Sequence, residues 1–150
     1  TWEERLPGDN TETFAAMSMD GGATFGTDFN VSDTDTGSFN PQIAMSDDNV
    51  VITWVELLGD NNEIFAAMSM DGGATFGPGF NVSKTTDTDS EDPQVAMSGD
   101  NVVITWQEEL SGNNFETFAA MSMDGGATFG SGFNVSDTDT DSEDPQVAIN

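Results

Sequence analysis

Apolar residues occur in short runs that are separated by turn-forming residues along the whole chain. Residues 50–55 are all β-branched or aromatic, which is typical of a strand covered on both faces. Residues 64–70 alternate instead, with Ile64 and Ala66 on one side and Phe65 and Ala67 on the other. The pattern therefore predicts an all-β protein built from short strands.

Around these two runs the sequence predicts a unit of four antiparallel strands. A proline opens the first strand, where its missing N–H is tolerated at a sheet edge. Turn residues at 59–62 separate the second strand from the third, and Asp71-Gly72-Gly73 predicts a tight hairpin between the third and the fourth. The expected strands are residues 41–45, 50–55, 64–70 and an interrupted strand over 74–76 and 80–83.

This unit is repeated three times. Thirteen consecutive residues are identical at 14–26, 65–77 and 118–130, and Trp2, Trp54 and Trp106 recur at intervals of 52 residues. A strand-rich period near fifty residues is typical of propeller blades, and we expect the three tryptophans to pack in the core. We predict one repeat array over 1–150, with blade units near 1–36, 37–88 and 89–140 and a partial blade at 141–150 that completes one with the N-terminus.

The hairpin within the identical segment resembles a known motif. Its sequence, Ser-Met-Asp-Gly-Gly-Ala-Thr-Phe, is similar to the Asp box of sialidase-type (BNR) β-propellers, Ser-x-Asp-x-Gly-x-Thr-Trp, with Phe in the last place. The resemblance implies a propeller in which the box is a structural element and not an active site. The matching residues are Ser18, Asp20, Gly22, Thr24, Phe25, Ser69, Asp71, Gly73, Thr75, Phe76, Ser122, Asp124, Gly126, Thr128 and Phe129.

The residue inventory argues against the sialidase activity that this resemblance suggests. That activity requires three arginines to bind a substrate carboxylate and a tyrosine nucleophile, whereas the chain has Arg5 alone and no tyrosine or histidine. Two carboxylates could in principle hydrolyse a glycoside, but none breaks the repeat as a grafted site would. We therefore predict no catalytic residues and no enzyme activity, with a glycosidase fragment as an alternative.

The charge of the chain restricts its partners. The chain has 28 acidic residues and two basic residues, Arg5 and Lys84, so the formal net charge is −26. Such a charge repels nucleic acid and anionic membrane surfaces, and no apolar run approaches the ~18 residues of a membrane span. We expect no nucleic acid and no membrane insertion, and a folded state that depends on cations, either as bulk salt or as bound ions.

The acidic residues are densest between the fourth strand of one unit and the first strand of the next. Alternating carboxylates repel one another unless a cation lies among them, and hard oxygen ligands favour Ca²⁺. The loop lacks the glycine and the final glutamate of an EF-hand loop, and a solvated acidic loop is the alternative. The candidate calcium ligands are Asp87, Asp89, Glu91, Asp92, Asp137, Asp139, Asp141, Glu143 and Asp144.

N-glycosylation sequons begin at Asn30, Asn81 and Asn134, at equivalent places on the predicted outer strand. Together with the acidic composition and the lack of cysteine, they favour an extracellular or cell-surface location.

The two ends of the sequence form complementary parts of one unit. Thr1-Trp2 corresponds to the end of a second strand, and residues 145–150 correspond to a first strand. We expect residues 145–149 to pair with the segment from Trp2 to Arg5 of another copy, in a closed ring or a head-to-tail polymer. A window on a longer protein is the alternative. The expected function is a non-enzymatic, self-associating structural or surface-interaction module, or otherwise a carbohydrate-binding, lectin-like module with glycan partners.

Overall fold

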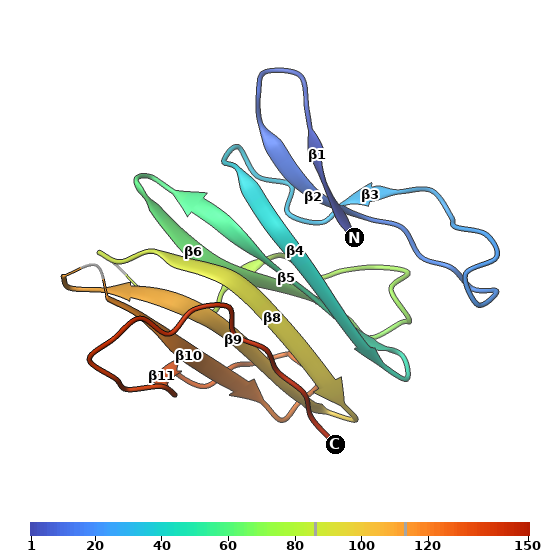
Figure 1. Cartoon of the computed structure of the whole chain (residues 1–150). Coiled ribbons are helices and arrows are strands. Elements are labelled where there is room, and N and C mark those ends of the chain that lie inside the picture. The colour runs from blue at the N-terminus through green and yellow to red at the C-terminus, as the bar shows by residue number, and fades with distance from the viewer. Residues whose placement is uncertain (86, 113) are drawn as a thin grey trace.

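The computed structural model describes residues 1–85, 87–112 and 114–150, and its regular structure there consists of β-strands alone. The strands form three antiparallel sheets that lie side by side in chain order and do not close into a ring (Figure 1). Sheet A contains β1–β3, sheet B contains β4–β7 and sheet C contains β8–β11. The strand bounds are β1 Trp2–Arg5, β2 Thr11–Ala15, β3 Phe29–Asn30, β4 Ser38–Ser46, β5 Asn49–Leu58, β6 Asn61–Ser69, β7 Phe80–Asn81, β8 Ser90–Ser98, β9 Asn101–Leu110, β10 Asn114–Ser122 and β11 Phe133–Asn134.

The prediction of an all-β chain with repeated four-stranded antiparallel units is confirmed in sheets B and C. Each strand follows the previous one in space, and β5 pairs with β6 from Leu58 opposite Asn61 to Val50 opposite Ser69. The first strand starts earlier than expected, at Ser38 in β4. The register of β4 shifts between Phe39 and Gln42, which accommodates the proline that cannot donate to the ladder.

Sheet A has three strands, and among the described residues of the chain β1 pairs only with β2. Residues 145–150 have no regular secondary structure and do not pair with β1 of the same chain. Their pairing with β1 of another copy stays a prediction.

The predicted fourth strand is wrong over residues 74–76. In sheet B it is reduced to β7, and residues 74–76 join no ladder. The physical reason is that Asp71 binds both the N–H and the hydroxyl of Thr75, which folds these residues onto the turn. The chain then rejoins β6 through one backbone bond from Gly77 N to Met68 O, of 2.9 Å.

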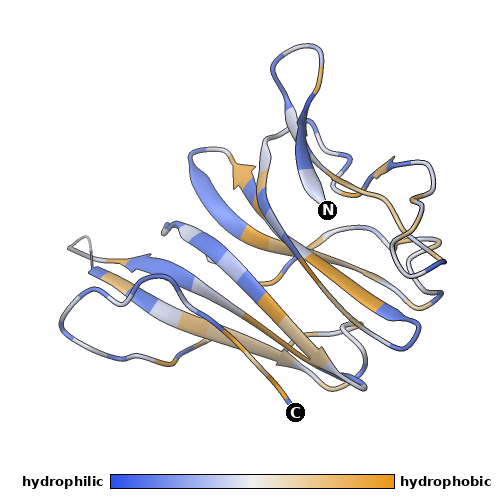
Figure 2. Ribbon diagram, turned by 45° about the vertical axis from the view of Figure 1, so that its right-hand side comes forward, coloured by the Kyte–Doolittle hydropathy of each residue, from blue (hydrophilic) through white to orange (hydrophobic). Residues whose placement is uncertain are grey.

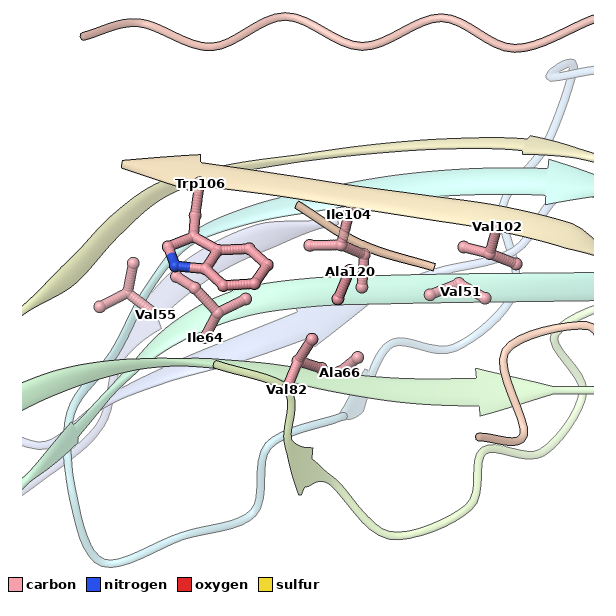
Figure 3. Packing of buried hydrophobic residues seen from close by; sticks show 9 residues of the cluster. All are labelled: Val51, Val55, Ile64, Ala66, Val82, Val102, Ile104, Trp106 and Ala120. Carbon is pink, nitrogen blue, oxygen red and sulfur yellow. The ribbon is translucent and has the colours of Figure 1, made fainter. Parts of the chain in front are cut away.

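Two apolar clusters lie between neighbouring sheets. Figure 3 shows the larger cluster, in which Ile104 and Trp106 of β9 lie near Ile64 of β6 and Val82. The smaller cluster joins sheet A to sheet B around Trp54. Residues 50–56 are all buried, as expected for a strand covered on both faces. In contrast, hydrophilic colour gathers at several hairpin turns (Figure 2). The two buried clusters place the core between the sheets.

The tryptophans differ between the copies. Trp54 and Trp106 are buried as predicted, whereas Trp2 is partly exposed, so the prediction is wrong for the first copy. In the part of the chain that the structure describes, no further sheet covers the outer side of sheet A, and this leaves Trp2 exposed. Among the described residues, no helix is long and apolar enough to span a membrane.

Candidate functional site

Each sheet carries one Asp-box turn. It follows β6 in sheet B, β10 in sheet C and β2 in sheet A. In sheet B the hydroxyl of Ser69 donates to Asp71 Oδ1 at 2.6 Å and accepts the N–H of Gly73 at 2.9 Å. Thr75 donates its N–H to Asp71 Oδ1 at 2.9 Å and its hydroxyl to Oδ2 at 2.6 Å. The same four bonds recur at Ser18, Asp20, Gly22 and Thr24 and at Ser122, Asp124, Gly126 and Thr128.

These hydrogen bonds lower the pKa of each box aspartate. The Ser69 hydroxyl, followed by Thr75, lowers the pKa of Asp71 from 3.8 to about 2, and Ser122 and Thr128 do the same for Asp124. For Asp20 the Thr24 hydroxyl is the largest cause of a pKa that is also about 2. Donors favour the ionised carboxylate, so the box aspartates carry no proton to give near neutral pH. Both of their oxygens accept hydrogen bonds within the turn.

The box turns also contact the preceding sheet. Gly73 has a φ of 85°, and a Cβ added there would lie 2.5 Å from Met17 Cε of sheet A. Gly126 has a φ of 94°, and its added Cβ would lie 2.8 Å from Val51 Cγ2 of sheet B. The positive φ favours glycine at both positions. At Gly126 the branched side chain of Val51 also leaves no room for a Cβ, whereas the flexible end of Met17 could move away from Gly73. The box therefore contributes to sheet-to-sheet packing.

The last box residue extends this contact. Phe76 lies against Phe29 of sheet A with ring centroids 5.5 Å apart, and Phe129 lies against Phe80 of sheet B at 6.0 Å. Aromatic pairs at such distances stabilise beyond their buried area.

Buried glutamates form a second constellation, which the sequence analysis missed. Glu56 on β5 lies directly opposite Glu63 on β6, and Glu108 on β9 lies opposite Glu116 on β10. All four are almost fully buried, as is Glu12 of β2. Like charges at opposite positions of a ladder destabilise it, and a buried charge needs strong donors. The donors come from the connections between sheets.

The first connection, residues 32–37, and Ser38 at the start of β4 lie between a glutamate of sheet A and one of sheet B. The hydroxyls of Thr34 and Ser38 each donate to Glu56 at 2.7 Å, and the hydroxyl of Thr36 also donates to Glu56. The N–H of Thr34 donates to Glu12 at 3.3 Å. One threonine therefore joins two carboxylates from different sheets.

The second connection repeats this arrangement. Thr88 and Ser90 donate their hydroxyls to Glu108 of sheet C at 2.5 and 2.8 Å. Thr85 donates its hydroxyl to Glu63 of sheet B at 2.7 Å. Because hydrogen bonds to a carboxylate are stronger than neutral ones, each connection is fixed to both of the sheets that it joins.

The tryptophans take part in the same network. Trp54 Nε1 donates to Glu56 at 2.7 Å, and Trp106 Nε1 donates to Glu108 at 2.8 Å. The repeated pattern Trp-x-Glu could have predicted this contact, because residues two apart on a strand point to the same face of the sheet.

The predicted calcium ligands do not converge in the described part of the chain. No group of three or more acidic side chains there could hold a metal ion. Asp89 instead accepts the N–H of Asn62 at 2.7 Å, Glu91 accepts its side-chain amide at 2.9 Å, and Asp141 accepts the N–H of Phe115 at 3.1 Å. Calcium binding stays a prediction.

The remaining candidate ligands lie in the loops, except Asp92, which lies in β8. Asp87, Asp137, Asp139, Glu143 and Asp144 are exposed, and Asp92 is partly exposed with a φ of 49°.

The sequon residues shape the turn after the last strand of each sheet. The side-chain oxygens of Asn30, Asn81 and Asn134 accept the N–H three residues later at 2.8 to 3.0 Å. The sequon serines, Ser32 among them, donate to a buried glutamate of the same sheet. Both residue types thus have a structural role, and glycosylation stays a prediction.

The described surface also has a hollow of about 530 Å³ beside the box of sheet B, lined by Met68, Met70, Pro78, Phe80 and Ala127 among others.

No protein-family model matches the chain, and no curated protein matches it.

Proposed function

We propose that the chain is a non-enzymatic structural module of the sialidase-type, Asp-box propeller class, which self-associates by adding sheet to sheet. The observation that carries this proposal is the hydrogen bonding at the two internal junctions. There, Glu56 accepts the hydroxyls of Thr34 and Thr36, and Glu108 accepts the hydroxyl of Thr88, all from the connection that precedes their sheet. The buried glutamates, which are the most reactive groups in the core, thus serve to hold neighbouring sheets together.

The Asp-box geometry supports the class. In each turn an aspartate binds the N–H and hydroxyl of the threonine four residues later. Such bonding is expected of a structural element, because polar groups of the turn find their hydrogen-bond partners within the same turn. Four-stranded antiparallel sheets in chain order fit propeller blades.

The carbohydrate-binding alternative is less well supported. A lectin site calls for aromatic side chains in loops that differ between the copies. Among the described residues, the exposed aromatic side chains of Trp2, Phe25 and Phe133 instead occupy positions that every copy shares. The equivalents of the two phenylalanines, Phe76 and Phe80, pack between sheets, which favours a stacking role.

An extracellular or cell-surface location belongs to the same proposal. It is supported by the three sequons and by a net charge of −26, which salt or bound calcium would screen.

Sedimentation velocity over a wide concentration range tests the proposed self-association. At high salt, with and without calcium, we expect the weight-average sedimentation coefficient to rise with protein concentration. A single monomer boundary under all these conditions would reject the proposed function. A panel of chromogenic glycosides, sialosides included, provides the test for catalysis, and turnover above a denatured control would reject the non-enzymatic assignment.

A further inference from the structure

We infer that sheet C of one copy binds sheet A of a second copy head to tail, through the same residue positions that join neighbouring sheets within the chain. The inference rests on the proposed self-association and specifies the surfaces and the partner.

Each internal junction has two faces. The head face belongs to the later sheet and comprises a tryptophan, a glutamate, a box glycine and a box phenylalanine, which are Trp54, Glu56, Gly73 and Phe76 in sheet B. The tail face belongs to the earlier sheet and to the chain that follows it, up to the first residue of the next sheet. It comprises a methionine, a phenylalanine, a valine and hydroxyl residues, which are Met17, Phe29, Val31, Thr36 and Ser38 at the junction of sheets A and B. These side chains meet in the buried cluster between sheets A and B and in the hydrogen bonds that Glu56 accepts from Thr36 and from Ser38 at the start of β4.

The apolar positions of two faces are uncovered in this chain. On the head face of sheet A, Trp2 is 38% exposed, whereas Trp54 and Trp106 are at most 1% exposed. On the tail face of sheet C, Val135 is 55% exposed, whereas Val82 is completely buried. Exposed apolar groups that are complementary to a second surface of the same molecule are the usual basis of head-to-tail association.

The phenylalanines and glycines repeat this contrast. Phe25 and Phe133 are 66% and 49% exposed, and their equivalents form the inter-sheet aromatic pairs. A Cβ added at Gly22 would meet nothing within 4 Å, whereas Gly73 and Gly126 lie against the preceding sheet. The partner for Gly22 would be Met121, which corresponds to Met17 and is exposed.

The polar positions are complementary as well. Glu4 corresponds to Glu56 and Glu108, but it accepts the indole N–H of Trp2 at 3.2 Å without a serine or threonine donor in the described structure. Thr140 and Ser142 correspond to Thr88 and Ser90, and neither donates to a glutamate in the described structure. One face therefore offers an acceptor where the other offers two hydroxyl donors.

The segment after β11 fits the open edge of β1. Residues 142–148 are identical to residues 90–96, which begin β8 and pair with β9. Because Ser90 lies opposite Glu108 and Glu91 opposite Gln107, the same register places Ser142 opposite Glu4 and Glu143 opposite Glu3 of the second copy. The second pair has like charges, so salt should strengthen the association.

The contact is heterologous, since its two faces differ and each copy carries both. A variant blocked at one face can therefore still use the other. Val135→Arg blocks the tail face and Phe25→Arg blocks the head face. Both positions are exposed in the single chain, so neither change disturbs a buried contact within it.

Met123→Arg is the matched control. Met123 lies on sheet C and is exposed, and its equivalent Met70 remains 71% exposed although sheet B has neighbours on both sides. A new arginine at this position adds the same charge without entering a junction.

Sedimentation velocity at high salt distinguishes the outcomes. We expect wild type and Met123→Arg to associate, and Val135→Arg and Phe25→Arg each to lose association at least about tenfold in Kd, which corresponds to about 1.4 kcal/mol. An equimolar mixture of the two blocked variants should form a 1:1 dimer that does not grow further. Its formation also shows that both variants are folded.

If wild type associates and either blocked variant does so equally well, or if their mixture gives no dimer, the head-to-tail junction is wrong while self-association stands. If wild type stays monomeric, both proposals fail.

Discussion

Truncation of Val82 to alanine tests the packing between sheets B and C. Val82 follows β7, is completely buried and shares an apolar cluster with Ile64 and Trp106. Val135 holds the equivalent position after β11 but is 55% exposed. Both substitutions remove the same atoms, so the difference between them isolates what burial between sheets contributes to stability.

The structure sets the expected size of the effect. Val82→Ala removes two methyl groups, each of which contributes about 0.8 kcal/mol when buried. A residual cavity of about 50 Å³ would add roughly 1 kcal/mol, at ~24 cal/mol per Å³. The free energy of unfolding should fall by about 2 to 3 kcal/mol for Val82→Ala. For Val135→Ala in dilute solution it should change by no more than roughly 0.5 kcal/mol.

Urea unfolding followed by tryptophan fluorescence measures both values, because Trp54 and Trp106 are buried and become exposed on unfolding. Val31→Ala, at the equivalent position between sheets A and B, should resemble Val82→Ala, since Val31 is also buried. Equal losses at Val82 and Val135 would refute the reasoning, because burial between sheets would then contribute nothing.

Further predictions concern the polar groups. Glu108→Met leaves the hydroxyls of Thr88 and Ser90 and the indole of Trp106 without their acceptor, and it should lower the unfolding free energy by at least about 2 kcal/mol. The control Glu109→Met should change the unfolding free energy by less than roughly 0.5 kcal/mol. Equal urea midpoints for the two variants would contradict this expectation. The pKa of Asp71 is lowered from 3.8 to about 2. The stability that its carboxylate contributes is therefore complete above pH 3.8 and is lost as the pH falls from there through about 2. A carboxyl NMR titration of Asp71 with a midpoint near 4 would show that the turn does not stabilise the charged form. Calcium should raise the melting temperature more than sodium at equal ionic strength, and equal shifts would leave charge screening as the only effect.

The second and third strands of sheets B and C could be predicted because each contains a continuous apolar or alternating run near turn residues. Residues 50–55 and 64–69 are of this kind, and three copies of the same pattern confirmed the period. The end of the third strand and the reduced fourth strand could not be predicted in this way. They depend on Asp71, whose carboxylate binds Thr75 and withdraws residues 74–76 from the ladder.

The buried glutamates were missed because acidic side chains rarely lie in a core without partners. Their partners, such as Thr34 and Thr36, lie about twenty residues away in the chain and become neighbours only when the connection folds between two sheets. The aspartates of the same connections attracted a calcium prediction because of their density. In the structure Asp89 and Asp141 each accept a backbone N–H of the preceding sheet.

The exposure of Trp2 offers the most direct test of head-to-tail association. Fluorine NMR of the chain labelled with 5-fluorotryptophan resolves three signals, and the shift of each on exchange from H₂O to D₂O reports its contact with solvent. In dilute solution the Trp2 signal should show this shift and the signals of buried Trp54 and Trp106 should not. As the chain associates, the solvent shift of Trp2 should disappear. A Trp2 signal that keeps its full solvent shift while the sedimenting mass increases would contradict the proposed junction.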